Sequence, residues 1–236
     1  MKISLIIPAY NEEKYINRCI SSAEKHSSDL FEIIVVDNNS TDKTKEIAES
    51  FSNVRVIHEK EKGVTRARQR GFLESGGDIL AFIDSDTYLN DEWFEILKKE
   101  FTNSEKLVCL SGPYIYYDVP KYQRVLVWIY WNIFARIAYL LAGYMVVGGN
   151  FAIRRDVLEK MNGFDTTIDF YGEDTNTARR ASKYGKVKFN FHFNIFTSGR
   201  RFFGQGLWNT AIIYVSNFFS EVFLKKPITK DYTDLR

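Results

Sequence analysis

Four short apolar runs, separated by stretches long enough for helices, constrain the fold of this chain more than any other feature. The runs cover positions 3–7, 33–36, 54–57 and 79–83, and the stretches between them, such as 12–25, have helical length. Near-continuous apolar character is typical of parallel strands that are covered on both faces. The pattern therefore predicts an α/β domain with a doubly wound, mostly parallel central sheet flanked by helices.

Polar residues follow three of these runs, and they include a carboxylate triplet. Ligands of such sheets bind beyond the carboxyl ends of the strands, where Asn11, Asp37 and Asp84 would converge. In Asp84, Ser85 and Asp86 the acids begin where the strand ends. Carboxylate oxygens are ligands that Mg²⁺ or Mn²⁺ prefers, so the triplet predicts a metal site. The alternative is an Asx-turn or a cap of the next helix.

Two further segments carry groups that suit a nucleotide. Asp37 could accept a hydrogen bond from a base N–H or a ribose hydroxyl, although the loop after it also suits a helix cap by Ser40 or Thr41. Three arginines fall within positions 66–70, and guanidinium groups suit phosphate oxygens. A solvated basic face is the alternative there, and Arg68 is the one we expect to point inward.

An acid pair, Glu173 and Asp174, opens a helical stretch. Acids at a helix N-terminus are favoured by the macrodipole alone. The functional alternative is a general base that takes a proton from an acceptor hydroxyl, for which Asp174 is the first choice. His192 stands alone in a strand-like run, 187–193, so a structural histidine is favoured, with metal ligation left open. His26 and His58 are expected at the surface.

The order of these motifs resembles the inverting family 2 glycosyltransferases. The resemblance rests on segments 8–13, 35–42, 67–68, 84–86, 148–150 and 172–174. It implies a GT-A (Rossmann-like) fold and a metal-dependent, inverting transfer of one sugar from a nucleotide-sugar donor, with Mg²⁺ or Mn²⁺ as cofactor. It also implies nucleotide binding by Pro8, Tyr10, Glu12, Asp37, Arg68, Asp84 and Ser85, metal binding by Asp86 and Asp84, catalysis by Asp174 with Glu173, and a sugar and acceptor pocket at Gly149 and Asn150.

Departures from the family pattern limit the assignment of the donor and the product. Asn38 and Asn39 replace the commoner Asp-Gly, and Gln69 stands where Asn often follows Ala-Arg, so the donor base stays open between UDP and GDP. A Gln-x-x-Arg-Trp motif of the processive synthases is missing, because Gln205 and Trp208 lack the arginine between them. A single transfer is therefore expected rather than polymer extension.

Length, charge and cysteine content bound the rest of the prediction. We expect a catalytic domain at 1–205, with a nucleotide-binding half (1–112) and an acceptor-binding half (113–205), and a C-terminal apolar helix and tail at 206–236. The net charge of +2 gives no reason to expect a nucleic-acid partner. Cys19 and Cys109 are expected as buried free thiols in a reducing compartment, and the N-terminal apolar run is too short for a signal peptide.

Two apolar helical stretches point to a membrane surface. Positions 125–147 have transmembrane length but include Arg136, which would cost about 2.5 kcal/mol or more at a bilayer centre. The stretch 207–224 is similar, and Arg200, Arg201, Lys225 and Lys226 flank it. Apolar faces beside basic residues favour peripheral contact with the inner face of the membrane, from the cytoplasm. The acceptor could then be a lipid-linked glycan or polyprenyl phosphate, with Arg200 and Arg201 near its phosphate; a homodimer is the alternative.

Two other functions remain open from the sequence alone. A sugar-nucleotide nucleotidyltransferase would also use metal-binding aspartates on an α/β fold, but it should have a glycine-rich loop where Pro8 to Asn11 stand. A non-catalytic protein that binds a membrane or a glycan could retain the fold, and substitution of Asp174 would then change nothing measurable.

Overall fold

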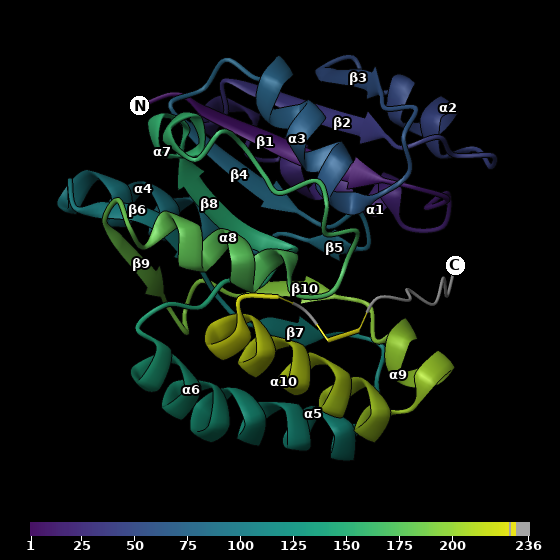
Figure 1. Ribbon diagram of the computed structural model, residues 1–236. Coiled ribbons are helices and arrows are strands. Elements are labelled where there is room, and N and C mark those ends of the chain that lie inside the picture. Colours follow the sequence, from purple (N-terminus) through teal and green to yellow (C-terminus); the bar gives the residue numbers. More distant parts are fainter. Residues whose placement is uncertain (227, 230–236) are drawn as a thin grey trace.

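The structure is a computed structural model that describes residues 1–226 and 228–229. Its central sheet has seven strands in the order β3-β2-β1-β4-β8-β6-β9 (Figure 1). β8 runs antiparallel to both of its neighbours, β4 and β6, and the other pairs are parallel. The fold class predicted from the sequence is confirmed. The strands are β1 (Ile3–Ala9), β2 (Glu32–Asp37), β3 (Val54–His58), β4 (Ile79–Ile83), β6 (Leu107–Ser111), β8 (Asn150–Arg154) and β9 (Lys186–Phe189).

The four apolar runs became β1 to β4, because both faces of these strands are covered by helices. Every residue of β1 is buried, and successive side chains enter different cores. Leu5 and Ile7 pack in one core, whereas Ile6 packs in the other. The helices involved are α1 (Ile16–Glu24), η1 (Ser27–Asp29), α2 (Thr44–Glu49), α3 (Val64–Glu74), α4 (Trp93–Asn103), α7 (Arg155–Lys160) and α8 (Glu173–Ala181).

The two cores divide these helices between the faces of the sheet. α1, α2 and α4 contribute to the first core, and α3, α7 and α8 to the second. α3 lies so close to β1 that a Cβ atom on Gly71 would meet Ile6 Cγ2 at 2.4 Å, so only glycine fits there. Cys19 and Cys109 are buried free thiols, as expected from the sequence.

A second, three-stranded sheet was not predicted from the sequence. It has the order β5-β10-β7 and consists of β5 (Thr87–Tyr88), β10 (Ile195–Thr197) and β7 (Tyr114–Tyr116). Because β5 directly follows the Asp84 to Asp86 triplet, its pairing with β10 brings the start of α9 (Arg200–Gln205) to the carboxyl end of β4.

The strand expected over 187–193 is wrong in its second half. β9 ends at Phe189, and a turn follows in which Phe193 N–H donates to Asn190 O at 3.0 Å. His192 is exposed on this turn. No group of three or more His, Cys, Asp or Glu side chains that could hold a metal ion occurs among the described residues, so His192 has no partner set for ligation there.

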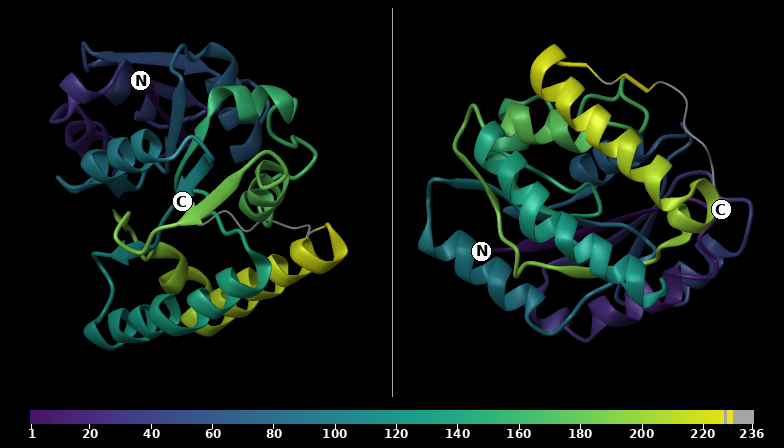
Figure 2. Two further views of the ribbon diagram at one scale, coloured as in Figure 1. Left: turned by 90° about the vertical axis from the view of Figure 1, so that its left-hand side faces the viewer. Right: turned by 90° about the horizontal axis from the view of Figure 1, so that it is seen from below.

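Two long helical segments lie side by side beneath the sheets, and both further views show them in the same arrangement (Figure 2). The first is a continuous run made of α5 (Lys121–Ile129), a π-helical turn η2 (Tyr130–Phe134) and α6 (Ala135–Ala142), and it ends at Gly143 in the left-handed conformation that favours glycine. The second is α10 (Leu207–Leu224), as the sequence predicted. Residues 227 and 230–236 of the predicted C-terminal segment lie outside the described residues.

Candidate functional site

The carboxyl ends of β1, β2 and β4 meet at one edge of the central sheet. β1 pairs in parallel with β2 on one side and with β4 on the other, so the loops after Ala9, Asp37 and Ile83 all open at this edge. The sequence predicted this convergence. The candidate site is built on these loops, with additions from the second sheet and from α8.

Asp84 turns its side chain toward the site while its backbone makes a turn. Its carbonyl oxygen accepts from Thr87 N–H at 3.1 Å and from the Thr87 hydroxyl at 2.7 Å. Its carboxylate Oδ2 accepts from the Tyr114 hydroxyl at 3.2 Å. The turn proposed as the alternative to a functional site is thus present, but it uses the backbone and leaves the carboxylate facing the site.

Arg68 is the inward member of the arginine cluster, as predicted. Its side chain is only 2% exposed, and its guanidinium lies between Asp84 Oδ1, at 3.2 Å from Nη2, and Glu173 Oε1, at 2.5 Å from Nη1. Arg66 and Arg70 instead pair with Glu61 and Glu74 on the outer face. Arg68 therefore joins the end of β4 to the start of α8.

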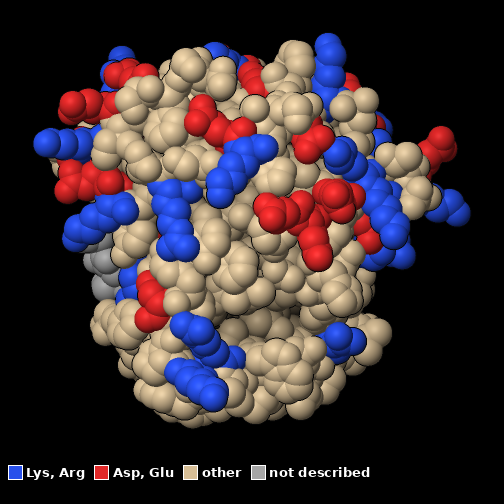
Figure 3. All heavy atoms as spheres, turned by 180° about the vertical axis from the view of Figure 1, so that it is seen from behind, with Lys and Arg blue, Asp and Glu red and all other residues tan. Residues whose placement is uncertain are grey.

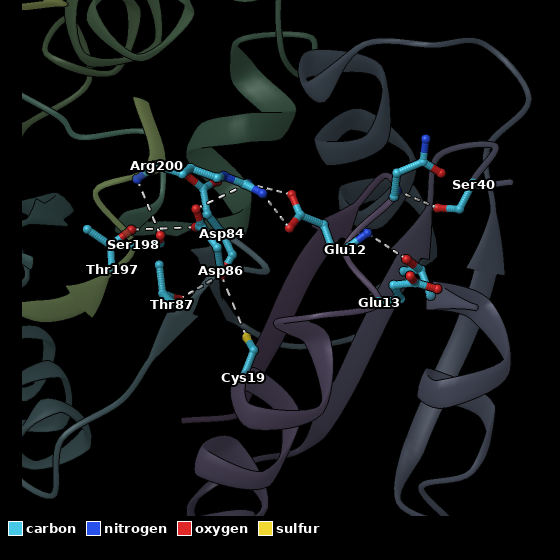
Figure 4. A network of polar contacts seen from close by, with 12 residues as sticks. Glu12, Glu13, Cys19, Ser40, Asp84, Asp86, Thr87, Thr197, Ser198 and Arg200 are labelled. Atoms are coloured by element: carbon cyan, nitrogen blue, oxygen red, sulfur yellow. Dashed lines mark hydrogen bonds and ion pairs between the residues drawn. The ribbon is translucent and has the colours of Figure 1, made fainter. Parts of the chain in front are cut away.

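Asp86 lies in a second ion-pair cluster, which Figure 4 shows at the ends of β1 and β4. Arg200 Nη2 lies 3.1 Å from Asp86 Oδ2, and the two terminal nitrogens of Arg200 donate to both carboxylate oxygens of buried Glu12, at 2.8 and 2.5 Å. Thr197 Oγ1 lies 3.5 Å from Asp86 Oδ1. The prediction that Arg200 faces an acceptor phosphate is corrected here, because β10 carries it back onto the carboxylates of the sheet edge.

The two clusters hold more negative than positive charge. Arg68 forms ion pairs with Asp84 and Glu173, and Arg200 forms ion pairs with Glu12 and Asp86. The single positive charge of each guanidinium therefore offsets the charge of only one of its two carboxylates. Burial raises the pKa of Asp86 to about 7; Arg200 opposes the rise, and Glu12 and Asp84 add to it. A site with this surplus attracts a cation.

Asp37 occupies a third position along the edge, where its partner is a histidine. The Asp37 side chain is 3% exposed, and its Oδ2 lies 3.2 Å from His58 Nδ1. Sequence reasoning assigned His58 only to the surface. The parallel register places the two residues opposite each other at the ends of β2 and β3, so adjacent strand ends were the signal that could have found this pair.

Three other predicted nucleotide-site residues lie along the same edge. Pro8 is buried within β1 and pairs with Val36 of β2, so it forms part of the strand. The Tyr10 hydroxyl accepts from Lys62 Nζ at 2.7 Å. Ser85 is buried between the two aspartates of the triplet.

Both Gly149 and Asn150 were expected to line a sugar and acceptor pocket, and the structure gives the two residues different surroundings. A Cβ atom on Gly149 would meet Asp84 Oδ2 at 2.2 Å, so its backbone lies against that carboxylate. The prediction for Asn150 is corrected: its side chain is fully buried, accepts from Trp93 Nε1 at 2.9 Å, and donates to the carbonyls of Gly112 and Phe193. Its polar atoms support the wall of the site.

Glu173 and Asp174 form the first turn of α8 and have distinct surroundings. Burial raises the pKa of Glu173 to about 7, while its partner Arg68 opposes the rise. Asp174 is less buried, and its Oδ1 accepts from Thr175 N–H at 2.7 Å. Burial also raises the pKa of Asp174, and the N–H groups of Thr175 and Gly148 oppose that rise. Asp174 is therefore the carboxylate of the pair without an arginine bonded to it in the described structure.

The aromatic surroundings of Asp174 were not predicted. The negative charge of Asp174 adds to the raised pKa values of Tyr130, from the helical run 121–142, and of Tyr214, from α10. Tyr171 stacks edge-on against Tyr214, with ring centroids 5.8 Å apart, and Arg201 lies over the ring of Phe170, 4.5 Å from its centroid. The side of the site that Asp174 faces is thus bounded by the two long helical segments.

The donor set at the sheet edge fits a divalent cation. Asp84 and Asp86 offer hard carboxylate oxygens separated by one small residue, and the guanidinium of Arg200 already occupies a cationic position beside Asp86. Mg²⁺ is commonly bound by only one or two carboxylates, with phosphate oxygens and waters completing its shell. A set of two aspartates that lacks a third protein ligand is therefore sufficient.

Comparison with known proteins identifies relatives for two thirds of the chain. A family model described as "Glycosyl transferase family 2" matches residues 4–161. Glycosyltransferase AglE of Haloferax volcanii is 39% identical over 100 residues, which cover 39% of this chain and 33% of that protein. Glycosyltransferase GlyG of Streptococcus pneumoniae is 32% identical over 119 residues, which cover 48% of this chain and 40% of that protein. The chain thus spans less than half the length of these relatives.

Solved structures share the fold over nearly the whole chain. TarS 1–349 of S. aureus superposes with a TM-score of 0.67 at 20% identity, covering 98% of this chain and 67% of that one. The mannosyltransferase PcManGT of Pyrobaculum calidifontis, in complex with GDP-Man and Mn²⁺, has a TM-score of 0.67 at 17% identity, covering 95% of this chain and 63% of that one. These likenesses confirm the GT-A fold.

Proposed function

Because the chain belongs to glycosyl transferase family 2, we propose that it transfers one sugar from a nucleotide-sugar donor to an acceptor hydroxyl or phosphate, with inversion at the anomeric carbon. The observation that carries the proposal is the meeting of Asp84, Asp86 and Arg68 at the carboxyl edge of the sheet, with Asp174 close by on α8. These residues supply the groups that the reaction needs. They are a cation-binding set for a diphosphate and, for the acceptor, Asp174, a carboxylate with no arginine bonded to it in the described structure.

The nucleoside of the donor binds at Asp37. This carboxylate ends β2 beside His58, at the strand edge where ligands of open α/β sheets bind. We keep both UDP and GDP as candidate carriers. TarS has been solved with UDP-GlcNAc and the Pyrobaculum mannosyltransferase with GDP-Man, and the residues near Asp37 do not distinguish the two bases.

Asp86 and Asp84 hold Mg²⁺ or Mn²⁺, which when bound neutralises negative charge on the diphosphate leaving group. The chain's own cations complete this role. Arg68 is fixed by Glu173 and Asp84 close to the metal set, and Arg200 already balances the charge of Asp86. Both guanidinium groups are held by carboxylates, so they are positioned without the entropy cost of ordering them on binding.

Asp174 acts as the general base when the acceptor is a hydroxyl. Its carboxylate takes the hydroxyl proton as the acceptor oxygen bonds to the anomeric carbon and the bond from that carbon to the diphosphate breaks. Burial raises the pKa of Asp174, which strengthens it as a base. A phosphate acceptor would already be ionised and would need no proton removal, so Asp174 would then orient the acceptor.

The acceptor is a glycan or a lipid-linked molecule that reaches Asp174 beside the two long helical segments. Tyr130 and Tyr214 of these segments lie close enough to Asp174 for its charge to affect their pKa values. We place the protein at the cytoplasmic face of a membrane. The two buried free thiols are consistent with a reducing compartment.

Release of nucleoside diphosphate from a panel of UDP- and GDP-sugars, with and without Mn²⁺, tests the proposal without a known acceptor, because water can take the place of the acceptor hydroxyl and receive the sugar. Metal-dependent release from at least one donor is expected, and Asp174→Asn should lower it sharply. No release from any donor, with intact folding, would contradict transfer activity. Equal release by wild type and Asp174→Asn would contradict the role of Asp174 as base.

A further inference from the structure

On α10 the buried positions are polar and the most exposed positions are apolar, although Asn209 and Ser216 are also exposed and Phe218 packs inward. Buried positions on this helix are Thr210, Asn217, Ser220 and Glu221, whereas Trp208, Ile212, Phe223 and Leu224 are 61–73% exposed. A helix on the surface of a protein in water has the opposite arrangement, with its apolar stripe facing the core. The apolar side chains on the outer face of α10 would therefore be more stable in contact with an apolar surface than in water.

Ion pairs prevent α10 from turning its apolar face inward. Glu221 is fully buried, and its Oε1 accepts from Arg179 Nη2 at 2.8 Å and from Asn176 Nδ2 at 3.1 Å, both on α8. Rolling the helix would expose apolar residues of the core and would leave Arg179 unpaired. Removing one partner of a buried charge pair is strongly unfavourable. The outward apolar face is thus a fixed feature of the fold.

The helical run 121–142 continues the same surface. Only 6% of its apolar stretch is buried, although by length and composition it could cross a membrane. Its inner side packs in a small core with Met145, Phe189 and Phe218, so the run lies along the body of the protein. Trp128, Phe134, Leu140 and Leu141 face outward. We call the run 121–142 and α10 together the helical layer.

On the described part of the helical layer, and at Lys225 and Lys226 directly after it, the exposed charged side chains are basic; the exposed acid Asp118, just before the layer, accepts from the Ser198 hydroxyl and Gly199 N–H. The basic side chains are Lys121, Arg124, Arg136, Lys225 and Lys226. The one acid in these segments is Glu221, which is buried and paired. Figure 3 shows mixed acidic and basic side chains over the upper part of the molecule, whereas the charged side chains near its lower edge are Lys or Arg.

We infer that the helical layer is seated on the surface of a lipid bilayer with anionic headgroups. Exposed tryptophans and aliphatic side chains enter the headgroup and acyl boundary, and the basic side chains meet the headgroup phosphates. Both helices lie in the plane of the layer, so the contact is peripheral and does not span the bilayer. A second copy packed on this face would bring basic side chains of both chains together, and neither helical segment has an exposed acid of its own among the described residues to balance them.

This seating deepens the proposed function by naming the surface that meets the membrane, and its consequence for the substrate rests on the proposed transfer activity. α10 packs on α8, which carries Asp174 in its first turn, and Glu221 Oε1 of α10 accepts from Asn176 Nδ2 of α8 at 3.1 Å. When the helical layer contacts the bilayer, the part of the site near Asp174, where we propose that the acceptor binds, lies close to the lipid headgroups. An acceptor with a lipid tail could then stay in the membrane while its polar end reaches Asp174.

Flotation of the purified protein with vesicles tests the seating directly. One set of vesicles contains phosphatidylcholine alone and the other contains phosphatidylcholine with phosphatidylglycerol. We expect wild type to float with the anionic vesicles, and Leu141→Glu to lower its partition coefficient by roughly tenfold or more, because a leucine side chain no longer leaves water. The matched control is Leu73→Glu, which changes a leucine on α3 that is 65% exposed, against 77% for Leu141, and should leave binding unchanged.

Tryptophan fluorescence of the unmutated protein guards against a folding defect in the variant. Trp128 and Trp208 are exposed on the helical layer, whereas Trp93 is fully buried and Trp131 is partly buried with its ring stacked on Phe189. Brominated lipids should therefore quench wild type, and should quench Trp128→Phe/Trp208→Phe, which keeps Trp93 and Trp131, far less. The inference is overturned if wild type neither floats nor is quenched, or if Leu141→Glu floats as well as wild type. A wild-type dimer that Leu141→Glu converts to a monomer, with no vesicle binding, would assign the face to a second copy. Donor turnover in solution is a separate readout, so failure here leaves the proposed function standing.

Discussion

Arg200 Nη2 lies 3.1 Å from Asp86 Oδ2, although the two residues are far apart in the sequence. The contact depends on the pairing of β10 with β5, which brings the start of α9 to the end of β4. Arg200 also donates to both oxygens of Glu12. In this arrangement a cationic side chain of the protein occupies the position beside the carboxylate that we assign to a metal ion.

Substitution of this arginine should therefore favour metal binding. We expect Arg200→Gln to tighten Mn²⁺ binding in the absence of nucleotide by roughly three- to tenfold, about 1 kcal/mol, because the cation no longer competes with a guanidinium. The same variant should lose about 3 kcal/mol of unfolding free energy without metal, since two buried carboxylates lose their partner, and should recover part of it with Mn²⁺.

Electron paramagnetic resonance of free Mn²⁺ measures the affinity, and thermal unfolding measures the recovery. Arg66→Gln is the matched control, because Arg66 pairs with exposed Glu61 on the outer face. Unchanged or weaker metal binding by Arg200→Gln would contradict the assignment of Asp86 as a metal ligand.

Asp174→Asn should separate catalysis from donor binding. We expect kcat to fall on the order of 10²- to 10⁴-fold, the usual contribution of a general base, while the Kd for nucleoside diphosphate changes little. Steady-state kinetics and calorimetric titration measure the two quantities, and exposed Asp169→Asn serves as the control. A large loss of donor affinity in Asp174→Asn would instead place Asp174 in the donor site.

The pH profile should carry the signature of this base. Asp174 acts in its deprotonated form, and burial raises its pKa, so activity is lost as pH falls through that raised value. The acid limb of kcat/KM should therefore lie above the value of about 3.9 that is typical of a solvated aspartate. An acid limb at the ordinary aspartate pKa would argue against Asp174, and a limb removed only by Glu173→Gln would transfer the role to its neighbour.

Asp37→Asn should weaken the grip on the nucleoside. A carboxylate that accepts a hydrogen bond contributes about 1.5–3 kcal/mol, so the Kd for nucleoside diphosphate should rise roughly ten- to hundredfold with little change in Mn²⁺ affinity. Calorimetric titration checks both values. The control is Asp156→Asn, whose exposed carboxylate pairs with Lys160 within one helix. Equal nucleotide binding by Asp37→Asn and wild type would remove Asp37 from the donor site.

The sequence predicted the parts of the fold that depend on continuous burial. β1, β2 and β4 were recognisable because both of their faces enter cores, which produces near-continuous apolar runs, whereas β3, at the edge of the sheet, is only partly buried and keeps Arg55 exposed. The second sheet was not recognisable, because β5, β7 and β10 are two or three residues long and carry no periodic pattern. The placement of Arg200 could not be predicted for the same reason, since it depends on that sheet.

The candidate site divides in a similar way. Asp84, Asp86 and Asp37 stand at strand ends, so their convergence followed from the parallel topology, and Arg68 was the arginine of its cluster that we expected to point inward. Tyr114, His58 and the structural role of Asn150 depend on contacts between segments that no local pattern records. The basic residues beside the apolar stripe of α10 favoured a membrane surface, but the stripe alone looks the same whether it faces a core or a membrane, and the buried pair of Glu221 with Arg179 could not be predicted.

Thermal unfolding with a panel of nucleoside diphosphates, with and without Mn²⁺, tests the central claim most directly. A ligand at a hundred times its Kd raises the stability of the native state by about 2.7 kcal/mol, so binding should be visible as a higher Tm. We predict a rise in Tm that requires both Mn²⁺ and either UDP or GDP. In Asp86→Ala, the metal-dependent part of this rise should be lost. No metal-dependent rise with any nucleotide, in protein that unfolds cooperatively, would contradict a nucleotide-sugar site at the Asp84 to Asp86 edge.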